Sequence, residues 1–425
     1  GYGAMNDTDA GSNSLGSQHN TFIGVDSGGG QWADAASSYN VAIGSGTMDS
    51  ALDGANSNVA LGYYALSGIT TGDNNVAIGH NAGILTTTGS GGVYIGYRAG
   101  YSNTAYSNVY IGQEAGYLLG NSAYGNTAVG TEAMKTSGTA NDNNPLNSTA
   151  VGSEAMRSIT TGDYNTGIGQ RAGFYNATGS YNTYVGTQSG QGASGSSQGY
   201  NTAVGYHTLY AITTGGNNTV LGYRAGDAIT TGSNNVAIGL EALGLNVTNS
   251  NNVAIGTYAA DALTAGTDCV FIGHYAGSSI TSAGGGTLDG AIAIGREAML
   301  GSASTTSAVG GAIAIGQDAM KSITTGAENI AIGMDALTLV TTGSSNVAMG
   351  FESLKNIVSG SGNIAIGYEA AEGFENAETG NIAIGHEVMA TLDEGTGGGD
   401  VDYNIGIGYQ AFSGSDLDSN DRQVK

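Results

Sequence analysis

A four-residue phrase recurs along the chain and constrains its fold more than any other feature. The phrase consists of a β-branched residue, a variable residue, an aliphatic residue and a glycine, and it occurs 22 times between Thr21 and Gly408. Eleven of the 21 intervals between its glycines are 17 residues long, and the others range from 16 to 23. A unit this short cannot bury a core alone, so consecutive units must stack. The period therefore predicts an all-β fold, a parallel β-solenoid (β-roll) of about 22 coils.

The repeat register divides the chain into three segments. Residues 1–19 resemble a degenerate coil, which would cap the solenoid or join it to another molecule. Residues 20–412 form the repeat shaft, and residues 413–425 form an acidic tail or the start of a missing domain. The chain begins with Gly1, which indicates a processed product or a portion of a longer polypeptide. Because strands of neighbouring coils lie about 4.8 Å apart, we expect one rod roughly 100 Å long.

Composition argues against several classes of partner. The chain has 34 Asp and Glu against 10 Lys and Arg, for a net charge of -24. Such a surface repels phosphate, so we expect no nucleic-acid partner and no binding to anionic lipid. No apolar run approaches the roughly 20 residues that span a bilayer, so we expect no membrane insertion. The single cysteine, Cys269, allows no intrachain disulfide.

Side-chain alternation along each strand predicts the core. The first and third positions of the phrase are Val, Ile or Thr and Ile, Leu, Val or Met, respectively. These two positions share one face of a strand, so we expect them to point into the coil. The core residues that represent this pattern are Val76, Ile78, Val236, Ile238, Ile330 and Ile332.

The middle position of the phrase is then expected to face outward. It holds 14 alanines and never a charged or amide residue. A long apolar stripe on a soluble rod is normally covered, and small residues let identical rods approach closely. We therefore predict an oligomer stripe that includes Ala77, Ala237, Ala254 and Ala331. A glutamate at Ala237 or Ala331 is expected to separate the subunits and leave the β-structure intact.

Asparagine precedes the phrase in 17 of the 22 copies. Stacked amides can hydrogen-bond to the coils above and below, and asparagine tolerates left-handed backbone. This pattern predicts a structural asparagine ladder, represented by Asn40, Asn75, Asn108, Asn235 and Asn363.

Tyrosine often follows the phrase-ending glycine. These tyrosines would form a partial stripe whose rings and hydroxyls suit contact with a glycan or protein. The alternative is that the rings stack on one another or pack against a neighbouring subunit. The surface contact candidates are Tyr63, Tyr97, Tyr206, Tyr223, Tyr368 and Tyr409.

We find no catalytic constellation and predict that the chain is not an enzyme. Glutamates recur two places after the glycine, but they are spread evenly along the chain, which is typical of a solvated face. The histidines form no metal-ligating cluster, and we expect neither cofactor nor metal. Calcium near Asp416 and Asp418 is the alternative, but Asp421 stands where a calcium loop needs glycine, so an acidic tail is favoured.

The phrase resembles the repeats of two protein families. It is similar to the NxVAIG-type head repeats of trimeric autotransporter adhesins, and still closer to arrays in bacteriophage tail fibre proteins. The matching strings are Asn201–Tyr206 (NTAVGY), Asn235–Gly239 (NVAIG) and Val93–Gly100 (VYIGYRAG). The resemblance covers about nine tenths of the chain. It implies a parallel β-roll in each chain of a homotrimer.

The resemblance and the repeat together lead to two hypotheses of function. The first is a structural and adhesive fibre shaft, as in a phage tail fibre or surface adhesin. It would lie outside the cell, on a virion or cell surface, and present loops or a tip to a glycan or protein of the host. The insertions at 141–146, 283–289 and 303–309 are candidate binding loops, and tolerated variation in repeat length is the favoured alternative. The second is a self-assembling extracellular filament or matrix protein whose rods join end to end.

Overall fold

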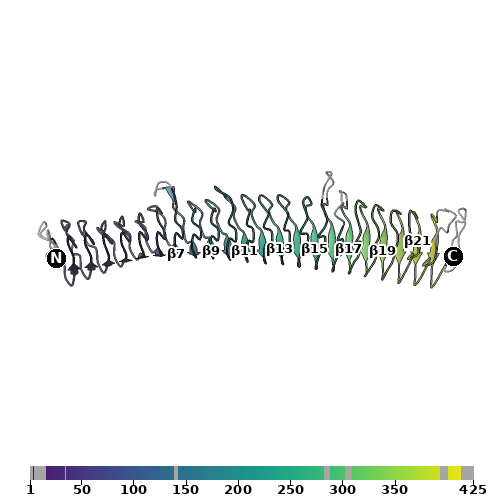
Figure 1. Ribbon diagram of the computed structural model, residues 1–425, viewed down its shortest axis with the longest axis horizontal. Coiled ribbons are helices and arrows are strands. Elements are labelled where there is room, and N and C mark those ends of the chain that lie inside the picture. Colours follow the sequence, from purple (N-terminus) through teal and green to yellow (C-terminus); the bar gives the residue numbers. More distant parts are fainter. Residues whose placement is uncertain are drawn as a thin grey trace. The chain divides into compact units, whose positions relative to one another are not determined.

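The computed structural model describes residues 3, 16–33, 35–137, 142–281, 288–301, 309–392 and 401–412. It divides the chain into two compact units, Gly1–Gly216 and Asn217–Lys425. Each unit is a parallel β-solenoid, in which consecutive coils stack along the unit (Figure 1). The predicted fold class and the 17-residue spacing are therefore confirmed. Among the described residues, no helix has the length and apolar character needed to cross a membrane.

Every coil contributes one strand of three residues. The first unit contains β1 (Thr21–Ile23), β2 (Val41–Ile43), β3 (Val59–Leu61), β4 (Val76–Ile78), β5 (Val93–Ile95), β6 (Val109–Ile111), β7 (Thr127–Val129), β8 (Thr149–Val151), β9 (Thr166–Ile168), β10 (Thr183–Val185) and β11 (Thr202–Val204). The second contains β12 (Thr219–Leu221), β13 (Val236–Ile238), β14 (Val253–Ile255), β15 (Val270–Ile272), β16 (Ile292–Ile294), β17 (Ile313–Ile315), β18 (Ile330–Ile332), β19 (Val347–Met349), β20 (Ile364–Ile366), β21 (Ile382–Ile384) and β22 (Ile405–Ile407).

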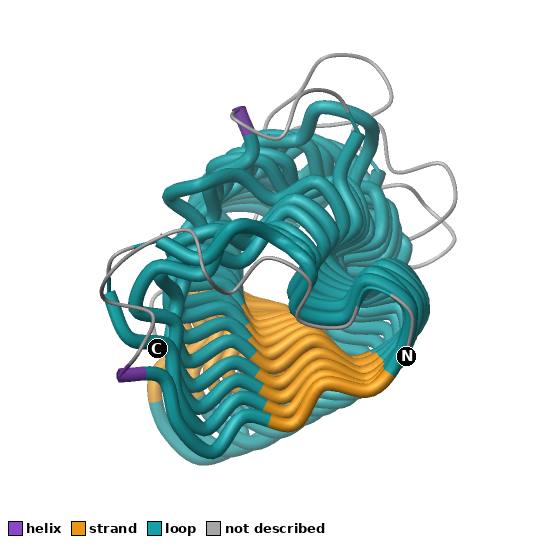
Figure 2. The backbone as a smooth tube through the Cα atoms, turned by 90° about the vertical axis from the view of Figure 1, so that its left-hand side faces the viewer, coloured by secondary structure: helices purple, strands orange, loops and turns teal. Residues whose placement is uncertain are grey.

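Within each unit the strands pair in parallel and without slippage. In β13 and β14, for example, Val236 lies opposite Val253 and Ala237 opposite Ala254. Equivalent residues of successive coils therefore form straight columns. The strands form one side of the coil, and turns and loops close the remainder (Figure 2). The β-branched residues of the phrase suit this pleated surface.

The two faces of each strand have the opposite orientation to the one predicted. The middle residue points into the coil: Ala77, Ala237, Ala254 and Ala331 are all 0% exposed. They are core residues, so the predicted alanine stripe for oligomer contact is wrong. The flanking side chains point outward and are half-buried or exposed. This corrects the predicted core role of Val76, Ile78, Val236, Ile238, Ile330 and Ile332.

The narrow interior of the coil explains the inversion. Two further positions share the inside with the middle residue, namely the alanine three places after the glycine and the residue that follows that alanine. In the β3 coil these are Ala65 and Leu66, both fully buried. A closed coil of this size has room for one strand side chain but not for two β-branched ones, because protein interiors pack to near-crystalline density.

Inside most coils, the middle residue of the strand and the residue that faces it differ in size, so that together they fill a similar volume. Tyr94 and Tyr110 occupy the middle of β5 and β6, and both are fully buried. Gly100 and Gly116 face these rings, and a Cβ on either glycine would overlap the ring beside it. In 11 of the 14 coils whose strand has alanine instead, the facing position carries Met or Leu, as in Ala42 with Met48. In these coils a small residue and a large one fill the interior together.

The phrase-ending glycine is required for two independent reasons. Its φ lies between 123° and 145° in all 22 coils, a region that side chains other than glycine rarely adopt. Within each unit, a Cβ there would also overlap the carbonyl oxygen of the equivalent glycine in the next coil, as at Gly79 and Gly96. The corner after each strand therefore allows close stacking of the backbones.

Candidate interaction surface

The outward side chains of the strands form a continuous uncharged face in each unit, with one aliphatic row beside a row of Val, Ile and Thr. The first row consists of Val, Ile and Thr, and the second of Ile, Val, Leu and Met. Several of these side chains are strongly exposed, including Ile43 at 38%, Leu61 at 44% and Ile168 at 41%. Eleven strands, each about 10 Å long and about 4.8 Å from the next, give a face of roughly 500 Å².

No charged side chain lies in either row of this strand face. This exclusion contrasts with the composition of the chain, in which Asp and Glu contribute 34 residues. The largest apolar patch on a typical monomer is about 300–600 Å² and is often functional. The strand face of one unit alone reaches the upper part of that range, so it is the strongest candidate for an interaction surface.

The asparagine column has a structural role inside the coil corner. The side chain of Asn75 donates to Asn58 Oδ1 at 3.0 Å and to the Gly89 carbonyl at 2.8 Å. Its own Oδ1 accepts from the backbone N–H of Gly92 at 2.8 Å. The predicted ladder is present at each of the five representative positions, Asn40, Asn75, Asn108, Asn235 and Asn363, which are all buried.

Two substitutions in the ladder are explained by local packing. At Gly92 a Cβ would meet the hydroxyl of Tyr94, which occupies the space of the missing amide. At Cys269 the thiol donates to the Leu288 carbonyl at 2.8 Å. Burial raises the pKa of Cys269 to about 11, with a smaller contribution from nearby acidic residues. The only cysteine of the chain is therefore a buried thiol rather than a reactive one.

The tyrosine contact candidates are all exposed, at 41–72%. Several of them lie in a series of aromatic rings along their unit: the centroid of Tyr63 lies 5.1 Å from that of His80, which lies 5.5 Å from that of Tyr97, and the rings are tilted by 35° and 40°. Near the end of the second unit, Phe351, Tyr368, His386 and Tyr409 form a similar series. A ring inside such a series has neighbours on both faces and offers a ligand only its edge.

The structure contains a second aromatic column that was not predicted from the sequence. Tyr164, Tyr181 and Tyr200 each precede a ladder asparagine, and their rings stack at 5.1 Å with interplanar angles of 10° and 12°. All three have positive φ, between 55° and 62°. The signal that could have revealed this column is the Tyr-Asn pair that directly precedes the phrase in these coils.

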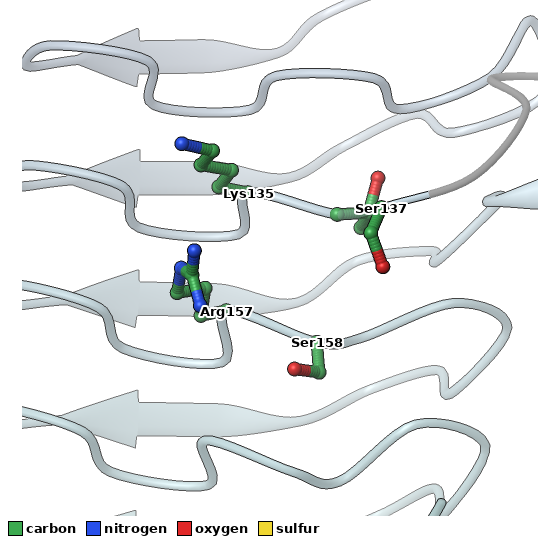
Figure 3. Close-up of a pocket in the computed structure, with 5 residues that line it drawn as sticks. Lys135, Ser137, Arg157 and Ser158 are labelled. Carbon is green, nitrogen blue, oxygen red and sulfur yellow. The ribbon is translucent and has the colours of Figure 1, made fainter. Parts of the chain in front are cut away.

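A charged edge runs two to five places after the repeat glycine. Each Lys and Arg that the structure describes lies within 4.0 Å of a carboxylate there. Lys135 and Arg157 both contact Glu132, and between them lies a cavity of about 80 Å³ that Ser137 and Ser158 also line (Figure 3). The glutamates of this edge therefore neutralise its cations and bridge successive coils.

One group of carboxylates among the described residues could hold a cation. Oxygens of Glu352, Glu369 and Glu372 lie within 4.8 Å of one another. Burial raises the pKa of Glu372, with further increases from Glu369 and Glu352. Oxygen donors of this kind suit Ca²⁺ or Mg²⁺, although Lys355 Nζ already lies 2.8 Å from Glu352. The alternative calcium residues, Asp416 and Asp418, lie outside the described residues, as do 413–425 as a whole.

Comparison with known proteins does not assign the chain to a family. No protein-family model matches the chain, and no curated protein matches its sequence.

Proposed function

We propose that this chain is the structural shaft of an adhesive fibre on a virion or cell surface, and that copies of it associate through the strand face. The observation that carries the proposal is the uncharged face of outward Val, Ile, Thr, Leu and Met side chains. The occupant we propose is the same face of further copies, three in all by analogy with the trimeric adhesins and tail fibres that the phrase resembles.

Physical chemistry favours a second copy over other occupants. Burial of apolar surface contributes roughly 25 cal/mol per Å², so covering the exposed aliphatic side chains within this face favours association. The columns repeat at the coil spacing, so two identical faces can align over their length. An acidic surface elsewhere keeps the assembly soluble and prevents association through other faces. Stacked backbone ladders provide the stiffness that a shaft needs.

Charge placed on the strand face tests this proposal. The triple variant Ile78→Glu, Ile168→Glu, Ile366→Glu puts one carboxylate on β4, β9 and β20, where the parent side chains are 36%, 41% and 37% exposed. A matched control is Leu85→Glu, Leu245→Glu, Leu339→Glu, at loop positions that are 47%, 57% and 43% exposed. Sedimentation velocity measures the mass of each particle, and far-UV circular dichroism measures its β-structure.

We expect a folded trimer for the parent and the control, and folded monomers for the strand-face variant. A monomeric parent, or a strand-face variant that assembles like the control, would refute the proposed surface. Open-ended threads in electron micrographs would favour the extracellular filament instead. Ala77→Glu, one residue from Ile78, is expected to unfold its coil rather than separate subunits, because Ala77 is fully buried.

A further inference from the structure

An unusual pocket opens in the second unit where an aromatic column gives way to a carboxylate column. Tyr258, Tyr275 and Glu297 each follow a repeat glycine by two places in successive coils. The rings of Tyr258 and Tyr275 stack at 5.1 Å with an interplanar angle of 7°. The next coil carries a carboxylate at this position instead of a ring, so the stacked column ends at Tyr275, whose ring also meets that of His274 in a T-shaped contact at 4.2 Å.

The space beside Tyr275 is an open surface pocket of about 280 Å³ lined by Tyr275, Ser278, Ser279, Glu297 and Leu300. Backbone hydrogen bonds hold its walls together: Glu297 N–H donates to the His274 carbonyl, and Ser279 N–H donates to the Leu300 carbonyl, each at 2.9 Å. Because these bonds join the two coils on either side of the cavity, the pocket is built into the solenoid. Its volume lies near the lower limit of about 300 Å³ for small-molecule pockets.

The lining combines the three kinds of group that recognise a sugar. The aromatic face of Tyr275 offers an apolar platform for the C–H face of a pyranose ring. The carboxylate oxygens of Glu297 contact Arg296 at 3.1 Å and Lys321 at 2.6 Å. Their remaining lone pairs can accept hydrogen bonds from sugar hydroxyls, and such charge-assisted bonds are about twice as strong as neutral ones. The hydroxyls of Ser278 and Ser279 can donate or accept, and Leu300 provides an apolar wall.

Electrostatics restricts the class of sugar. Arg296 and Lys321 pair with Glu297 and Asp318 beside the lining, so the charges of these four side chains balance. No excess positive charge is left there to select a sialylated or sulfated glycan, which the net charge of -24 would repel. We infer that this pocket binds a single neutral monosaccharide unit of a surface glycan, stacked on Tyr275 and held by Glu297. The inference rests on the proposed adhesive function and gives it a site and a ligand class.

Saturation-transfer NMR on the full-length protein tests the pocket, with D-glucose, D-galactose and N-acetyl-D-glucosamine as separate probes at millimolar concentration. We expect transfer to the ring protons of at least one sugar. Tyr275→Phe keeps the platform and should bind like the parent. Tyr275→Ala should weaken binding by about tenfold or more, since it removes the stacking surface. Ser279→Trp, which fills the pocket from its half-buried rim, should abolish the signal.

Tyr181→Ala is the matched control, because Tyr181 is a stacked ring with neighbours on both faces and should contribute nothing to sugar binding. Circular dichroism establishes which variants are folded; if Tyr275→Ala is not, Ser279→Trp decides. The pocket is refuted if no sugar gives transfer, or if a folded Tyr275→Ala or Ser279→Trp binds like the parent. Sedimentation of the same samples separates the two proposals, because assembly without sugar binding overturns only the pocket, whereas sugar binding by a monomeric parent overturns only the assembly.

Discussion

Replacing Asn346 by alanine should destabilise the second unit by breaking its asparagine ladder. The Asn346 side chain donates to Asn329 Oδ1 at 3.1 Å and to the Gly360 carbonyl at 2.8 Å. Its Oδ1 accepts from the backbone N–H and the side-chain amide of Asn363, at 3.0 and 3.1 Å. Every one of these groups is buried, so water cannot replace the lost amide.

The cost follows from the groups that lose their partner. Asn329 Oδ1 still accepts from the Asn346 backbone N–H, at 2.9 Å, and the Asn363 amide still donates to the Glu378 carbonyl. The Gly360 carbonyl and the Asn363 backbone N–H lose the bond that Asn346 provided. An unsatisfied buried polar group costs about 1–3 kcal/mol, so the free energy of unfolding should fall by roughly 4 kcal/mol.

Serine at this position should cost about half as much. Ser148 occupies the ladder naturally, and its hydroxyl accepts from the Asn165 backbone N–H at 3.0 Å. Asn346→Ser should likewise keep an acceptor for Asn363 and lose only the bond to Gly360. The neighbouring Ser345→Ala is the control, because Ser345 is exposed and its change should stay within about 0.5 kcal/mol.

Urea denaturation followed by circular dichroism measures the stability of each variant, and native-state hydrogen exchange measures the protection of the Asn363 amide. We expect the ranking parent, serine, alanine in both. Hydrogen exchange matters because a solenoid can open coil by coil, so that a local loss precedes global unfolding. An Asn363 amide that stays fully protected in Asn346→Ala would refute the ladder as a source of stability.

Two further predictions concern a corner glycine and a half-buried aspartate. Gly350→Ala should cost more than about 3 kcal/mol, because Gly350 has φ +145° and its new Cβ would overlap the Gly367 carbonyl oxygen. Gly311→Ala, with φ +70° and no atom within 4 Å of the new Cβ, should cost only about 1 kcal/mol in thermal unfolding; equal losses would contradict the steric argument. Burial, with a smaller effect of Glu241, raises the pKa of Asp261 from 3.8 to about 6, and its Oδ1 is buried without a hydrogen-bond partner. Because the unfolded state loses this proton first as pH rises, stability should fall between about pH 4 and 6 and stay lower above that range. Asp261→Asn should therefore stabilise the protein by about 1 kcal/mol at pH 7, after allowance for solvent screening, and have little effect at pH 3, whereas an equal gain at both pH values would contradict the assignment.

Much of the backbone could be predicted because the sequence repeats at a nearly constant spacing. The same local backbone preferences therefore apply at the same position of every coil. A β-branched phrase followed by glycine specifies a short strand and a corner, and equal spacing brings the same residue of every coil into one column. The asparagine ladder follows from the same logic, since Asn75 and its equivalents meet only if the coils stack in parallel. Glycine at the corner is recognisable because no other residue tolerates its φ.

The candidate site was less predictable. The six tyrosine candidates are exposed as expected, but aromatic neighbours such as His80 between Tyr63 and Tyr97 depend on ring orientations that a sequence pattern does not specify. The pocket beside Tyr275 arises from the change from a ring to the Glu297 carboxylate between neighbouring coils. Such a change is visible in the sequence only after the register of the coils and the direction of each side chain are known.

The sequence alone determined the number of phrases, the strand in each, the parallel register and the glycine corner, because each depends on local backbone preference and constant spacing. Only the tertiary structure decided which side of the strand is the inside. Both sides are apolar, with Ala77 on one and Val76 and Ile78 on the other, so hydrophobicity cannot distinguish them. The closed coil makes the choice because its interior accommodates alanine opposite methionine or tyrosine opposite glycine, as at Tyr94 and Gly100. The larger aliphatic side chains are thereby left on the outer face, where the proposed association would bury them.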